Sequence, residues 1–118
     1  VPIHISGYSK PALRRTARFG DGWIVGPVDP DAPYSYQDVP GLLHTIQDLR
    51  REAGRENLPF EVMAPGQVSF DVDHYRMMED MGITAVSVIH GDPTAPVSMP
   101  SQRQFMEEFA DKVISRMY

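Results

Sequence analysis

The segment Gly7-Tyr8-Ser9 has the residue types and the spacing of an anion-binding turn. It stands between a short apolar stretch, which predicts a strand, and a stretch with the periodicity of a helix. Gly7 lets the backbone approach a ligand closely, and the free N–H groups and dipole of a helix N-terminus favour an anion. With the Ser9 hydroxyl as a further donor, this junction predicts a phosphate site.

A structural explanation of the same junction stays open. Serine is a preferred N-cap residue, and the Ser9 hydroxyl can accept a hydrogen bond from a first-turn N–H. Pro11 fits the first turn of a helix because its missing N–H has no partner there. On this interpretation Ser9 is only a cap and Gly7 only a turn. The junction continues as Lys10-Pro11, so it is not the Gly-x-Ser-x-Gly elbow of hydrolases.

No other motif in the sequence assigns chemistry to the chain. A Walker loop and a dinucleotide-binding fingerprint are absent from the sequence. No group of His, Asp and Glu has the spacing of metal ligands, and the lack of cysteine excludes disulfides and thiolate metal sites. We therefore expect no metal, and the sequence assigns no catalytic residue.

The elements that must position this junction alternate along the chain. Strands are predicted at residues 1–7, 22–26, 59–64 and 84–90, and helices at about 10–19, 37–53, 71–81 and 102–117. Three helices end in a glycine shortly before the next strand, at Gly20, Gly54 and Gly82, and Gly20 is expected to be a left-handed helix stop. This rhythm is typical of βαβ units in a parallel sheet.

The predicted fold class is α/β, in a single domain that spans residues 1–118. Two parallel architectures are compatible with four β-α units. One is a small open parallel sheet with helices on both faces. The other is half of a (β/α)8 TIM barrel, whose full length is about 250 residues. Four units match half of that length, and a flavodoxin-like sheet requires a fifth strand, so the half-barrel is favoured.

The histidines are assigned from their places in these elements. His4 and Ser6 alternate with isoleucines, so they point into the barrel if the isoleucines face the helices. A hydrogen-bonded structural role is favoured for His4 over one that orients a hydride acceptor. His90 ends the fourth strand and is the better candidate for a pocket. His44 and His74 lie on predicted helices as surface positions.

Two further features have a structural and a functional interpretation. Arg14, Arg15 and Arg18 cluster on the first helix, where a solvated face with local ion pairs is favoured over a role in binding phosphate or a partner. Trp23 can stack on a ring, but its place inside a short strand favours a core or barrel-wall position.

Composition and charge narrow the class of partner. The 118 residues include 11 basic and 16 acidic side chains, for a formal net charge of -5. This balance argues against a surface for nucleic acid or anionic lipid. No apolar run reaches the roughly 18 residues that span a membrane, and no signal peptide is visible. The chain begins directly in a strand-like segment without Met, which suggests a missing upstream part. We expect a cytoplasmic protein.

Residues 6–23, SGYSKPALRRTARFGDGW, carry a family resemblance. This strand–Gly-x-Ser–helix–Gly-Asp-Gly-Trp run resembles the luciferase-like monooxygenase family, which includes FMN-dependent monooxygenases and oxidoreductases that use the deazaflavin coenzyme F420. A Pro-rich segment after the next strand, then Ala53-Gly54-Arg55 and finally Gly82-Ile83-Thr84, agree with it. The resemblance therefore covers nearly the whole chain.

The resemblance implies a (β/α)8 barrel of which this chain is the C-terminal half, with the first four strands missing. It implies contacts to the cofactor phosphate from two adjacent βα turns, by Gly7, Tyr8, Ser9, Gly26 and Pro27. The run is most similar to the F420-dependent branch, so F420 is preferred to FMN. The expected function is the cofactor-phosphate part of an oxidoreductase or monooxygenase that acts on a small-molecule substrate. The alternative is an inactive truncated half-barrel that self-associates. The expected partner is a second copy in a homodimer or the missing N-terminal half.

Overall fold

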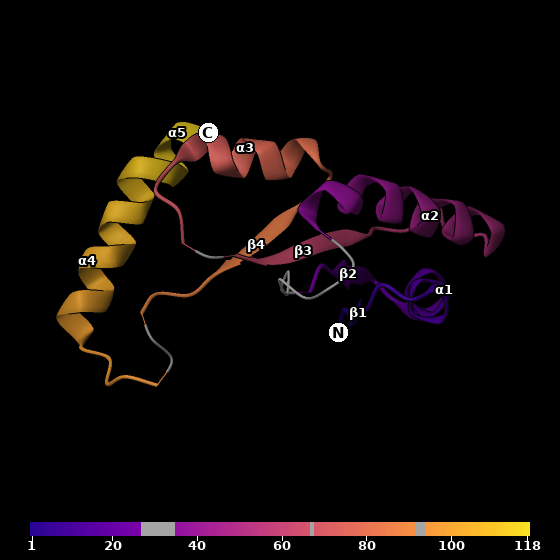
Figure 1. Cartoon of the computed structure of the whole chain (residues 1–118), viewed down its shortest axis with the longest axis horizontal. Helices are drawn as coiled ribbons and strands as arrows, with labels where there is room; N and C mark the ends of the chain where they lie inside the picture. The colour runs from indigo at the N-terminus through magenta and orange to yellow at the C-terminus, as the bar shows by residue number, and fades with distance from the viewer. Residues whose placement is uncertain (27–34, 67, 92–93) are drawn as a thin grey trace.

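Four strands form one sheet in which every strand is parallel to its neighbour (Figure 1). The computed structural model describes residues 1–26, 35–66, 68–91 and 94–118. The strands are β1 (His4–Ser6), β2 (Gly22–Ile24), β3 (Glu61–Gly66) and β4 (Ala85–Val88). Their order across the sheet is the order in the chain, β1-β2-β3-β4. Consecutive parallel pairing of this kind requires a crossover between each pair of strands.

Helical segments fill these crossovers and follow the last strand. They are α1 (Lys10–Phe19), the 3-10 turn η1 (Tyr36–Asp38), α2 (Val39–Glu52), α3 (Val72–Asp80), α4 (Met99–Phe109), the π-helical turn η2 (Ala110–Ile114) and α5 (Ser115–Met117). The last helical segment starts three residues before the predicted position because Ser98 accepts a hydrogen bond from the Ser101 N–H and caps α4. The π-helical turn within it was not predicted.

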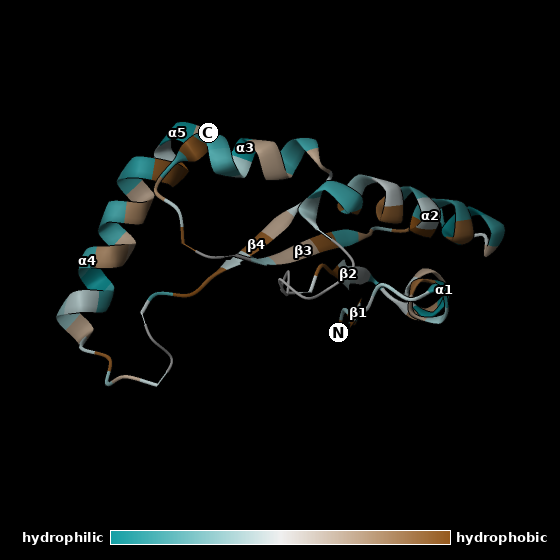
Figure 2. Cartoon of the chain, viewed as in Figure 1, coloured by the Kyte–Doolittle hydropathy of each residue, from teal (hydrophilic) through white to brown (hydrophobic). Residues whose placement is uncertain are grey.

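The helices cover one face of the sheet. Trp23, Val62 and Ala64 point to that face and are at most 3% exposed. They belong to one apolar core with buried side chains from α1, α2, α3 and η2. Figure 2 shows α2 turning its hydrophobic residues toward the strands. On the opposite face Met63 is only half-buried and Ser87 is exposed. The two faces therefore differ in how well they are covered.

The predicted α/β class is confirmed, and the described strands form a small open parallel sheet. The helices between the strands, α1, α2 and α3, lie on one face of this sheet, which differs from the two-faced arrangement considered for an open sheet. Strands that follow one another in chain order with crossovers of one hand place every helix on the same side. The half-barrel stays a prediction, since the described strands leave the sheet open.

Gly20 does not adopt the left-handed backbone that the sequence predicted. Its φ and ψ are -85° and 145°, which is extended backbone. Glycine is required there for space, because a Cβ would lie 2.8 Å from the Thr16 carbonyl oxygen. Positive φ occurs instead at the two later helix ends, where φ is 69° at Gly54 and 93° at Gly82. Among the described residues, no helix is long and apolar enough to cross a membrane.

Arg50 holds the connection between α2 and β3. It is 5% exposed, and its Nη2 donates to the carbonyl oxygens of Arg55 and Leu58, each at 2.8 Å. The guanidinium also lies over the Phe60 ring, 4.4 Å from its centroid. Burial, and then the nearby positive charge of Arg55, lower the pKa of Arg50. This buried cation gives the Leu58 carbonyl a donor and adds a second donor to the Arg55 carbonyl, which also accepts from the Leu58 N–H at 3.1 Å.

We expect Arg50→Met to lower the free energy of unfolding by about 2 kcal/mol, because the charge-assisted hydrogen bonds to the Arg55 and Leu58 carbonyl groups are lost. Arg51→Met is the matched control, since its side chain is 67% exposed and pairs with Asp48 at 3.1 Å. That exposed pair contributes about 0.5 kcal/mol or less. Urea denaturation of both variants measures the difference, and equal losses would contradict the role of Arg50.

Candidate functional site

Gly7 forms the turn at the carboxyl end of β1. Its φ of 127° is a conformation that side chains rarely adopt. A Cβ at this position would lie 2.7 Å from the Cβ of Ala12 in α1. Both the backbone angle and the available space therefore require glycine. The turn directs the chain straight from β1 into the N-terminus of α1.

Ser9 is the N-cap of α1, as its structural interpretation predicted. Its Oγ accepts a hydrogen bond from the Ala12 N–H at 3.3 Å, and Pro11 lies in the first turn. No acidic side chain lies in that turn, and Lys10 adds a positive charge to it. The cap occupies an acceptor site on the Ser9 oxygen and does not use its O–H as a donor. The start of α1 is therefore an electropositive end with a serine hydroxyl beside it.

Two crossed hydrogen bonds join this turn to the end of β2. The Tyr8 hydroxyl donates to the Gly26 carbonyl oxygen at 2.9 Å, and the Trp23 indole N–H donates to the Gly7 carbonyl oxygen at 3.1 Å. The Tyr8 and Trp23 rings also meet edge to face, with centroids 6.2 Å apart. The structure thus brings Gly7, Tyr8, Ser9 and Gly26 together, while Pro27 lies outside the described residues.

The Tyr8 hydroxyl keeps its proton in this environment. Burial raises the pKa of Tyr8, and the negative charge that Tyr36 carries when ionised raises it further. Because only the protonated hydroxyl can donate, the bond to Gly26 persists at neutral pH and is lost as pH rises through this raised pKa.

His4 has a structural partner that the sequence did not indicate. Its Nε2 lies 2.6 Å from a carboxylate oxygen of Glu61. The two residues belong to β1 and β3 and reach across Gly22 of β2, which pairs with both in the sheet register. A Cβ on Gly22 would lie 2.3 Å from the His4 ring. His4, Gly22 and Glu61 begin their strands, so the pair lies at the end of the sheet opposite the Gly7 turn.

His90 lies far from the Gly7 turn in the sheet order. It follows β4, and β2 and β3 stand between that strand and β1. Its ring stacks on Phe105 with centroids 4.4 Å apart, and its Nε2 lies 3.2 Å from the Ser101 hydroxyl oxygen. The structure therefore gives His90 neighbours on α4 and does not bring it to the predicted phosphate site.

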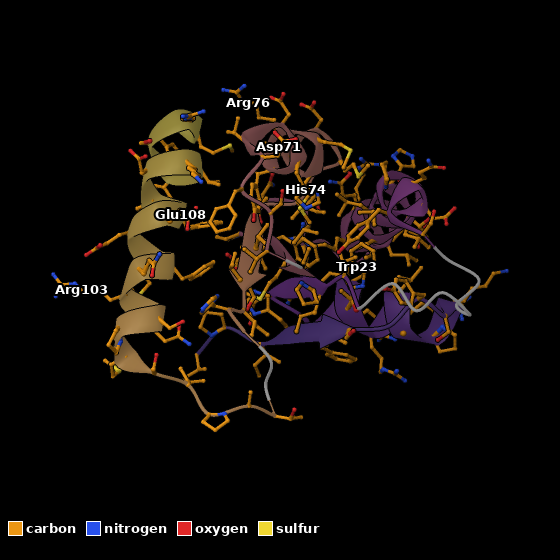
Figure 3. All side chains as sticks on the ribbon, turned by 60° about the vertical axis from the view of Figure 1, so that its left-hand side comes forward. Trp23, Asp71, His74, Arg76, Arg103 and Glu108 are labelled. Atoms are coloured by element: carbon orange, nitrogen blue, oxygen red, sulfur yellow. The ribbon has the colours of Figure 1, made fainter. Side chains whose placement is uncertain are left out.

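The helical histidines and arginines differ in part from expectation. His44 is exposed and lies near Asp48, as predicted, whereas His74 is half-buried and packs edge-on against Tyr75 (Figure 3). The described residues contain the exposed Arg14, Arg15 and Arg18 but no ion pair to any of them. Within the described ranges, no cluster of three or more His, Cys, Asp or Glu can hold a metal ion.

Comparison with known proteins shows similarity to longer mycobacterial proteins and to a dehydrogenase. Uncharacterized proteins of Mycobacterium bovis and Mycobacterium tuberculosis are 36% identical over 121 residues, which covers 99% of this chain and 39% of theirs. An F420-dependent glucose-6-phosphate dehydrogenase of Nakamurella multipartita is 31% identical over 113 residues, 96% of this chain and 31% of the dehydrogenase. The chain thus spans less than half the length of these relatives.

No family model matches the chain, and no solved structure matches it. The similarity to an F420-dependent dehydrogenase agrees with the oxidoreductase resemblance that the Gly7 segment carries.

We expect Gly22→Ala to lower the free energy of unfolding by about 2 kcal/mol, because the added Cβ would lie 2.3 Å from the His4 ring and 2.6 Å from the Glu61 carbonyl oxygen. Gly41→Ala is the control: nothing lies within 4 Å of a Cβ there, and alanine stabilises a helix relative to glycine by about 0.5 kcal/mol. Urea denaturation distinguishes the two. If Gly22→Ala were as stable as the parent chain, the close approach of the His4 ring and the Glu61 backbone to Gly22 would be wrong.

Proposed function

We propose that this chain supplies the cofactor-phosphate site of an oxidoreductase that uses a deazaflavin or flavin cofactor, with F420 preferred to FMN. The observation that carries the proposal is the pair of adjacent turns after β1 and β2, joined by hydrogen bonds at the N-terminus of α1. The similarity to an F420-dependent dehydrogenase supports the same cofactor class.

The physical case rests on donors and charge at the start of α1. A helix leaves its first N–H groups without partners inside the helix, and they attract an anion. Here Ser9 holds the Ala12 N–H, so the Lys10 N–H and the Ser9 O–H are the donors that would meet a phosphate. The Lys10 charge and the lack of an acidic residue in the first turn favour that anion.

The bound cofactor would supply the hydride acceptor, or with FMN the oxygen-activating ring, and the protein would supply position and electrostatics. The described residues Gly7, Tyr8, Ser9 and Gly26 would form the two turns of the phosphate site, and Pro27 belongs to the same proposal. The substrate is a small molecule on this proposal. No described side chain is assigned as its proton donor or base.

We expect Ser9→Ala to weaken binding of F420 and FMN by about tenfold, the effect of losing one hydrogen bond to a charged group. Ser98→Ala is a matched control, because Ser98 caps α4 with a bond of the same 3.3 Å length. Both variants lose a cap worth about 1 kcal/mol. Cofactor fluorescence titrations should show weaker binding for Ser9→Ala alone, and unchanged affinity in that variant would exclude the phosphate site.

We further propose that strands from outside these 118 residues complete the sheet as a barrel. Among the described strands, β1 and β4 each have one neighbour and one free edge. Beside β4 lies an open groove of about 410 Å³, which α3, η2 and α5 line with apolar residues. Free strand edges and exposed apolar surface favour association. The added strands would come from a preceding half-barrel or from a second copy of the chain.

A non-catalytic half-barrel that self-associates is the second candidate function, and particle mass tests it. If a second copy completes the sheet, light scattering should give twice the 13.3 kDa of the chain. Ile114→Glu, in the groove, should then yield monomers by burying a charge. Met106→Glu, on an exposed residue that does not line the groove, should not. A parent chain that stays monomeric at high concentration would contradict self-association and leave the preceding half-barrel.

A further inference from the structure

The two aromatic donors next to the Gly7 turn are fully used by backbone acceptors. An indole has one N–H and a phenol has one O–H. Trp23 gives its proton to the Gly7 carbonyl, and Tyr8 gives its proton to the Gly26 carbonyl. Trp23 is also 0% exposed, so its ring has no face open to a ligand. Figure 3 places it among packed side chains.

We infer that Tyr8 and Trp23 are positioning residues which hold the two turns together and so set the preference for phosphorylated cofactors. This inference rests on the proposed function and deepens it. It replaces the expected contact between Tyr8 and the phosphate with an indirect role. We call the pair of crossed hydrogen bonds, from Tyr8 to Gly26 and from Trp23 to Gly7, the turn latch.

The turn latch acts on the carbonyl groups as well as on the spacing. A carbonyl oxygen directed at a phosphate would repel it, whereas N–H groups attract it. The latch directs the Gly7 oxygen to the indole and the Gly26 oxygen to the phenol. The partial negative charges of these two carbonyl oxygens are thereby paired with aromatic donors of the protein. The N–H end of α1 is then the dominant dipole at this edge of the sheet.

Close packing makes the latch sensitive to small changes. A Cβ on Gly26 would lie 3.0 Å from the Tyr8 hydroxyl oxygen, so the second turn approaches Tyr8 as closely as a glycine allows. The raised pKa of Tyr8 keeps its proton available as the donor. Removing that hydroxyl frees the Gly26 carbonyl and loosens the contact between the turns, while the buried Trp23 core stays in place.

Tyr8→Phe tests the turn latch, with Tyr75→Phe as the matched control. The Tyr75 hydroxyl also donates to a backbone carbonyl at 2.9 Å, that of Ser69, but it belongs to α3. The probes are FMN and riboflavin, which differ by the phosphate alone. We expect Tyr8→Phe to reduce the ratio of FMN to riboflavin affinity by about tenfold. A general loss of stability would weaken the binding of FMN and of riboflavin equally and leave this ratio unchanged.

Deuterium exchange of the unliganded chain gives a second readout that needs no cofactor. Tyr8→Phe should speed exchange in residues 7–9 and 24–26, and Tyr75→Phe should not. Unchanged exchange in Tyr8→Phe would overturn the latch whatever the cofactor result. If exchange is faster but the parent chain binds neither F420 nor FMN better than riboflavin, the phosphate role is overturned and, with it, the proposed function. Faster exchange together with the lost affinity ratio would support both.

Discussion

The rest of the structure depends on the burial of the Trp23 side chain. It is the single tryptophan of the chain, it is 0% exposed, and it lies in the core that every described crossover helix joins. Its indole N–H, at the border of that core, donates a hydrogen bond to the Gly7 carbonyl oxygen. Burial of the ring fixes the helices on the sheet, and the one polar atom of the side chain fixes the first turn. The core and the candidate site are therefore coupled through one side chain.

The carboxyl ends and the amino ends of the parallel strands carry different kinds of interaction. At the carboxyl ends, glycines and aromatic donors shape turns that leave N–H groups exposed. At the amino ends, polar side chains hold the strands and their connections: Arg50 donates to two carbonyl groups, Arg55 donates to the Gly20 carbonyl, and the His4 ring contacts the Glu61 carboxylate. Parallel α/β sheets place ligands at the carboxyl ends of their strands. The candidate phosphate site of this chain, at the carboxyl ends of β1 and β2, agrees with that rule.

The sequence predicted the alternation of elements well because its signals are local. Apolar periodicity, helix-ending glycines and the Ser9 cap act within a few residues of one another. The contacts it missed join residues far apart in the chain. Glu61 meets His4 only after β2 has been placed between their strands, and the Tyr8 hydroxyl finds Gly26 only when two turns are adjacent. The glycine at position 22, in a strand where a larger residue is usual, was a sequence signal that side chains of the neighbouring strands pass over it.

The unequal faces of the sheet connect the site with the need for further strands. The helix-covered face buries Trp23, Val62 and Ala64. The other face carries the half-buried His4, Ile24 and Met63, and both sheet edges are free among the described strands. A cofactor held by its phosphate at the Gly7 turn must place its ring over surface that this chain provides only in part. The phosphate site and the completion of the sheet are thus two requirements of one proposed function. The phosphate site would fix one end of the cofactor, and the completed sheet would enclose the ring where the chemistry occurs.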